Sequence, residues 1–162
     1  MQADFNKAIE KAKQVLSDNF ISRPPIVAEA VARNYGLNVR FLFFKPQFFN
    51  ISGFIDNKGC LIVNAAESPG RQNFTVAHEL GHYLLGHLKN PDYGVLYRRP
   101  VGEQSDKPIE QEANCFAANL LVPEHMLRKT IAEFPFADAQ QLGKLFGVSA
   151  DVISFRRKDI GI

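Results

Sequence analysis

The chain has 162 residues, of which 46% are hydrophobic and 22% charged, and its formal net charge is +2 at pH 7. A chain of this length and apolar content can bury a core of its own, so intrinsic disorder is excluded. No run approaches the roughly 18 apolar residues of a membrane span, and no secretory signal opens the sequence, so we expect a cytoplasmic protein without membrane contact. The net charge is too small to indicate nucleic-acid binding, and the distant Cys60 and Cys115 favour buried, reduced thiols over a disulfide.

The first part of the chain combines helical and strand patterns. Apolar residues three and four positions apart predict a helix over about 3–18. Pro25 suits the first turn of a second helix, and Gly36 suits the position just after its end. Residues 37–44 are β-branched and aromatic, which predicts a strand. We expect alternate aromatic residues here to be buried against the helices, although an open edge could instead bind an extended segment.

The middle of the chain contains a hairpin pattern followed by a helix. Residues 48–55 and 60–63 lie on either side of the turn cluster Asp56-Asn57-Lys58-Gly59, which predicts a β-hairpin. A helix is expected over about 70–87. A loop is expected over 89–107, which contains two prolines and two glycines.

The remaining chain is helical by its pattern. A helix over about 108–121 stops before Pro123, and two or three short helices follow it. Helices, then a small antiparallel sheet, then helices indicate an α+β fold whose sheet packs on the two central helices. We expect a single domain over 1–162, with a core over about 1–135 and a C-terminal helical hairpin over about 136–162.

The string His78-Glu79-Leu80-Gly81-His82 is the most informative part of the sequence. Residues four apart lie on one face of a helix, so His78 and His82 can hold one Zn²⁺ at about 2.0–2.1 Å. Glu79 lies beside the metal and can take a proton from a water that the zinc activates, which is the H-E-x-x-H mechanism. Two exposed histidines on an amphipathic helix are the alternative, but the apolar neighbours of the motif indicate a buried helix, where histidine needs a partner.

A catalytic zinc usually has a third protein ligand. His87 would lie about 140° from the metal face of a continuing helix, so we interpret it as a favourable charge at the helix C-terminus. His125 has no flanking ligand pattern and is expected to be exposed. Glu110 shares a helix face with Asn114, which could hydrogen-bond a ligating histidine, and is the preferred ligand over Glu112. An exposed acidic first turn that complements the helix dipole is the alternative for either glutamate.

Two longer strings resemble the ImmA/IrrE-type metallo-endopeptidases. They are Arg71-Gln72-Asn73-Phe74-Thr75-Val76-Ala77-His78-Glu79-Leu80-Gly81-His82 and Glu110-x-x-Ala113-Asn114-x-Phe116-Ala117-Ala118-x-Leu120-Leu121-x-Pro123. The resemblance covers nearly the whole chain and implies zinc on His78, His82 and Glu110, with Glu79 as the general base. It further implies a bacterial or phage regulatory protease that cleaves helix-turn-helix repressors, often encoded nearby, and so switches on prophage or stress genes.

The C-terminal segment suggests a different function. Residues 140–156 have the spacing of a helix-turn-helix, and Arg156, Arg157 and Lys158 add a basic end. This pattern favours the alternative of a DNA-binding or protein-binding regulator with a structural or inactive zinc site. A packed helical hairpin is the simpler interpretation, because Asp151 begins the would-be recognition helix and repels phosphate. We therefore expect a zinc-dependent endopeptidase that makes limited cuts in a regulatory protein and does not bind DNA.

Overall fold

A computed structural model of the protein describes residues 2–90, 96–98 and 107–162, with the side chains of 96–98 excluded. Its helices are α1 (Phe5–Asp18), α2 (Ala28–Asn34), α3 (Pro69–Leu85), α4 (Pro108–Leu121), α5 (Glu124–Glu133), α6 (Ala139–Phe146) and α7 (Ala150–Asp159). Its strands and short 3₁₀ turns are β1 (Asn38–Leu42), η1 (Pro46–Phe48), β2 (Gly53–Ile55), β3 (Cys60–Asn64), η2 (His87–Lys89) and β4 (Leu96–Arg98). The α+β class that the sequence predicts is confirmed.

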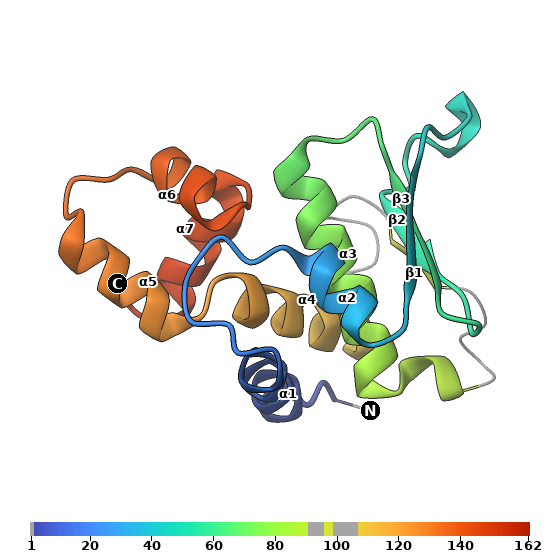
Figure 1. Ribbon diagram of the computed structural model, residues 1–162, viewed down its shortest axis with the longest axis horizontal. Coiled ribbons are helices and arrows are strands. Elements are labelled where there is room, and N and C mark those ends of the chain that lie inside the picture. The colour runs from blue at the N-terminus through green and yellow to red at the C-terminus, as the bar shows by residue number, and fades with distance from the viewer. Residues whose placement is uncertain (1, 91–95, 99–106) are drawn as a thin grey trace.

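The strands form one sheet in the order β1-β3-β2-β4 (Figure 1). β2 and β3 form the predicted antiparallel hairpin, and Asp56 Oδ1 fixes its turn by accepting hydrogen bonds of 2.9 Å from the backbone of Lys58 and Cys60. β1 pairs with β3 in parallel, so the sheet is mixed rather than antiparallel as predicted. The chain reverses direction before β2 and again before β3, so β1 and β3 run the same way. β4 pairs with β2 inside the segment that was expected to be a loop over 89–107.

The two central helices are α3 and α4, which pack against each other. The sheet stands on one side of them, and α5, α6 and α7 gather on the other (Figure 1). α1 packs along α4 and buries Ala8, Ala12, Val15 and Leu16, which follow the predicted helical stripe. The hydrophobic core therefore surrounds the pair of helices that carries the H-E-x-x-H motif and the two candidate glutamates.

The aromatic strand is exposed, which contradicts the expectation that alternate side chains would be buried. Val39 is the buried residue of β1, whereas Phe41 is 37% and Phe43 82% exposed. Phe48 and Phe49 beyond the strand are also exposed. The physical reason is position: β1 is an edge strand of the sheet, and the helices cover only its beginning.

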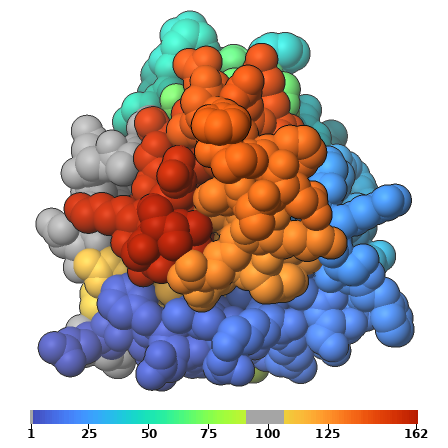
Figure 2. All heavy atoms as spheres, turned by 90° about the vertical axis from the view of Figure 1, so that its left-hand side faces the viewer, coloured from blue at the N-terminus to red at the C-terminus, as the bar shows by residue number. Residues whose placement is uncertain are grey.

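The C-terminal helices α5, α6 and α7 lie together above α1 on one face of the molecule (Figure 2). α6 begins with a capping box between Asp138 and Gln141 and ends at Gly147, whose positive φ of 69° turns the chain into α7. Arg156, expected as part of a basic end, is buried and donates from Nε to Val122 O at 3.1 Å. A buried guanidinium that is bonded to the protein's own backbone does not face a nucleic acid. The contact therefore favours the packed helical hairpin over a DNA-binding element.

Among the residues that the structure describes, no helix is both long and apolar enough to cross a membrane. Cys60 and Cys115 are free thiols, as predicted, but each is half-buried rather than buried. Burial raises the pKa of the Cys115 thiol, and the negative charge of Asp159 raises it further.

Candidate metal centre

The helix that carries the H-E-x-x-H motif has defined ends. Pro69 occupies the first turn of α3, where its missing N–H is not needed, and Gly86 ends the helix with a positive φ of 83°. Between these ends, His78 and His82 lie one helical turn apart on the face that meets α4. Both imidazoles are 1% exposed, so the expectation of a buried rather than a surface motif is met.

Three potential metal ligands converge between α3 and α4. The Nε2 atoms of His78 and His82 lie 3.0 Å apart, and the carboxylate oxygens of Glu110 lie 3.2 and 3.3 Å from them. All three ligand atoms fall within 4.8 Å of one another. Ligands about 2.0–2.1 Å from a tetrahedral zinc are separated by about 3.3 Å. The observed separations are close to this value, with Glu110 Oε2 toward His78 and Oε1 toward His82, and so suit one metal ion held by all three side chains.

Glu110 is buried beside the two histidines, with 6% of its surface exposed. Burial alone would raise the pKa of its carboxyl, but hydrogen bonds and charge from His78 and His82 outweigh burial and hold that pKa well below its usual range. The ionised, acceptor-only carboxylate is the form in which a glutamate side chain binds a metal ion.

The nitrogen of His78 that faces away from the cluster also has a partner. His78 Nδ1 lies 2.9 Å from Asn114 Oδ1, one turn after Glu110 on α4. The expected contact between Asn114 and a histidine of the motif is thus present. An amide oxygen accepts from Nδ1–H, so the unprotonated nitrogen of the neutral ring is Nε2, the atom that would bind a metal ion.

His87 is the site residue that sequence reasoning misjudged. It was interpreted as a favourable charge at the helix C-terminus, but it is buried, with 7% of its surface exposed, and its Nδ1 lies 2.9 Å from His82 Nδ1. Gly86 ends α3 and turns the chain back, so the 140° offset of a continuing helix does not apply. Glycine just after the last helical residue is the sequence signal that could have revealed this turn.

Glu112 is also buried, which excludes the exposed acidic turn as the interpretation of either glutamate. Its Oε2 lies 2.9 Å from His87 Nε2, and its Oε1 accepts a 2.8 Å hydrogen bond from the backbone N–H of Asp4. Burial lowers the pKa of the His87 imidazole, although the hydrogen bond to Glu112 opposes this effect. Glu110 and Glu112 therefore face different partners from the same helix.

The remaining sequence candidates have separate locations. Glu79 is completely buried next to His78 on α3, and His125 is exposed on α5, as expected. Three tyrosines were candidates for stabilising an oxyanion. Tyr83 is 39% exposed, Tyr93 lies outside the described residues, and the side chain of Tyr97 is likewise not described.

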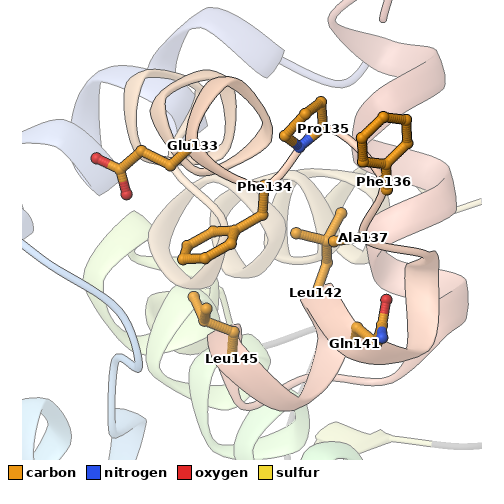
Figure 3. A pocket seen from close by; sticks show the side chains of 8 residues that line it. All are labelled: Glu133, Phe134, Pro135, Phe136, Ala137, Gln141, Leu142 and Leu145. Atoms are coloured by element: carbon orange, nitrogen blue, oxygen red, sulfur yellow. The ribbon is translucent and has the colours of Figure 1, made fainter.

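A pocket of about 480 Å³ lies away from this cluster, between the end of α5 and α6 (Figure 3). Its lining is mostly apolar and includes the exposed Phe134, Leu142 and the exposed Leu145, with Glu133 as its carboxylate. Because histidine and cysteine are absent from the lining, this pocket does not offer the chemistry that the cluster on α3 and α4 offers.

Comparisons with known proteins show which family the chain is similar to. Residues 32–158 match the family described as the IrrE N-terminal-like domain, a peptidase family. The radiation response metalloprotease IrrE of Deinococcus radiodurans is 32% identical over 94 residues, which is 57% of this chain and 28% of the relative. The metallopeptidase ImmA of Bacillus subtilis is 29% identical over 100 residues, which is 62% of this chain and 57% of the relative. The chain thus spans between about a quarter and three fifths of the relatives it matches.

A solved structure shares the fold. A Mycobacterium tuberculosis transcriptional regulator matches with a TM-score of 0.68 and 17% sequence identity, over 95% of this chain and 56% of that chain. The family match covers most of the chain and includes both helices that carry the candidate ligands. The resemblance read from the sequence is thereby confirmed, and the chain belongs to the IrrE N-terminal-like family of peptidases.

Proposed function

We propose that the protein is a zinc-dependent endopeptidase that makes limited cuts in a regulatory protein. The observation that carries the proposal is the convergence of His78 Nε2, His82 Nε2 and a Glu110 carboxylate at separations that suit one tetrahedral ion. Two histidines and one glutamate are the ligand set of zinc peptidases that keep a fourth position open. Family membership gives the reaction class independent support.

Each side chain then has a distinct task. Zinc, when bound, polarises the scissile carbonyl and lowers the pKa of water to about 7. His78, His82 and Glu110 hold the ion between two helices that the core fixes. Glu79 is the general base: its carboxylate accepts the proton of the attacking water and passes it to the leaving amine.

We propose a helix-turn-helix repressor, encoded nearby, as the substrate, and the cytoplasm as the location. The resemblance to ImmA/IrrE-type enzymes supports the repressor, and two free thiols suit a reducing compartment. A substrate strand must be extended for its carbonyl to reach the ion, so loops are cut while helices are protected. Cleavage should therefore be limited to one or a few bonds.

The test compares the wild-type protein with Glu79→Gln, which keeps the shape of the side chain and removes the base. Each is incubated with the repressor encoded next to its gene, with zinc or with chelator, and fragments are read by mass spectrometry. We expect zinc-dependent fragments from the wild type and a rate about 10²–10⁴-fold lower from Glu79→Gln. Wild-type cutting rates in Glu79→Gln, or promoter binding that survives chelator without any fragments, would contradict the proposal.

A further inference from the structure

The buried His87 and Glu112 have no task in the reaction proposed above, yet they join one candidate ligand to the N-terminal helix. His82 Nδ1 lies 2.9 Å from His87 Nδ1, and His87 Nε2 lies 2.9 Å from Glu112 Oε2. Glu112 Oε1 accepts from the backbone N–H of Asp4, the N-cap residue of α1, at 2.8 Å. Three successive hydrogen bonds therefore connect α3, η2, α4 and α1.

Metal binding fixes the direction of these hydrogen bonds. A neutral imidazole carries one proton, so His82 can offer the Nε2 lone pair to a metal only if the proton is on Nδ1. His82 Nδ1–H must then donate to His87 Nδ1. His87 in turn carries its proton on Nε2 and donates it to the Glu112 carboxylate. In this arrangement the N–H groups of His82, His87 and Asp4 each face an acceptor.

The reverse arrangement is incompatible with the metal site. If His87 carried its proton on Nδ1, His82 Nδ1 would have to accept, and the His82 proton would move to Nε2. A protonated Nε2 has no lone pair for a metal ion. The acceptor-only Glu112 carboxylate opposes this reversal, because it requires an N–H on His87 Nε2.

We propose that His87 and Glu112 are positioning residues that hold His82 in its metal-binding tautomer and orientation. The inference rests on the metal site proposed above. Residues that hydrogen-bond a ligating histidine commonly set its tautomer and raise its basicity, and their loss weakens metal binding about 10–100-fold. Here the support for His82 ends on a charged carboxylate, which Asp4 N–H fixes, whereas His78 is supported by the neutral amide of Asn114.

The test uses the 162-residue chain and three variants. His87→Leu removes both ring nitrogens, and His87→Asn keeps an acceptor, Oδ1, close to the position of Nδ1. Glu112→Gln replaces one acceptor oxygen by a donor group. Thr130→Val is the control, because it removes a buried polar group from α5, outside the cluster. The zinc dissociation constant is measured by competition with a chromophoric chelator, and unfolding of the metal-free proteins is followed in denaturant.

We expect His87→Leu to bind zinc about 10–100-fold more weakly, Glu112→Gln about tenfold more weakly, and His87→Asn within about threefold of the wild type. Thr130→Val should lose stability without a change in zinc affinity. The imidazole ¹⁵N shifts of the zinc-loaded wild type should show His87 protonated on Nε2 alone, and Glu112→Gln should show both tautomers.

Two outcomes would overturn the inference alone. One is unchanged zinc affinity in His87→Leu, and the other is an equal loss in His87→Leu and His87→Asn, which would reduce His87 to a packing residue. A wild-type protein that binds no zinc would instead overturn the metal site, and the inference with it. Failure of the proposed function and failure of the positioning role are therefore distinguishable.

Discussion

Gly81 of α3 lies against the ring of Phe116 of α4, so closely that a Cβ built on Gly81 would come within 2.9 Å of the ring Cδ1. The same Cβ would lie 3.4 Å from the backbone Cα of Ala113. Since real Cβ atoms essentially never approach another heavy atom to less than 3.0 Å, glycine at position 81 sets the spacing between α3 and α4. This spacing also determines the separation between the histidines of α3 and Glu110.

Gly81→Ala should push the two helices apart and weaken zinc binding. Overpacking in a core costs about 1–3 kcal/mol, and a displaced ligand should lower zinc affinity about 10–100-fold, as other changes in ligand support do. Zinc titration and denaturant unfolding measure the two effects separately.

The control for this substitution is Gly143→Ala, whose Cβ would come within 2.8 Å of Val148 O between α6 and α7. It should destabilise the fold by a similar amount and leave zinc affinity unchanged. An equal loss of zinc affinity in both variants would mean that zinc binding depends on the overall stability of the protein and not on the spacing between α3 and α4.

Zinc content should be about one ion per chain in the wild type, because two histidines and one carboxylate make one site. His78→Ala and His82→Ala should each abolish it, as measured by elemental analysis after gel filtration. His125→Ala, at an exposed histidine, should keep the full metal content. Full zinc retention in either of the first two variants would remove that residue from the ligand set.

The two glutamates of α4 should differ in the size of their effect. Glu110→Gln removes a charged ligand, so zinc affinity should fall by more than the roughly 10–100-fold typical of residues that only support a ligand. Glu112→Gln acts through His87 and should stay within that range. Isothermal titration of both variants gives the order, and a larger loss in Glu112→Gln would move the ligand to Glu112.

Cys115 should be alkylated more slowly than an ordinary thiol at mildly alkaline pH. The pKa of its thiol is raised, chiefly by burial. The fraction of thiolate at a pH near 8 is therefore smaller in the folded protein than in the unfolded chain. The rate with iodoacetamide, measured against pH in a Cys60→Ser background, should reach half of its maximum at a higher pH in the folded protein than in urea. Identical pH profiles in both states would contradict the effect of burial.

Local patterns predicted most of the elements of this fold. α4 spans 108–121 as expected, because Pro108 and Pro123 bound a helical run, and the β2–β3 hairpin follows from its Asp56–Gly59 turn. The candidate ligands were also readable, since the spacing of H-E-x-x-H depends only on helix geometry.

Features that depend on tertiary arrangement were predicted wrongly or not at all. The place of His87 depends on a left-handed residue, Gly86, that returns the chain toward His82. The exposure of Phe41 in β1, and of Phe43 just after the strand, depends on which strands flank β1, and periodicity does not reveal whether a strand lies at the edge of a sheet.

The exposed edge of β1 has a consequence for the behaviour of the protein in concentrated solution. An edge strand with large apolar side chains is a template for pairing with another chain, and natural proteins protect such edges with cationic residues. Arg40 and Lys45 are the exposed cations on either side of Phe41 and Phe43. The colloidal stability of the protein therefore depends on two local charges more than its overall charge of +2 would suggest.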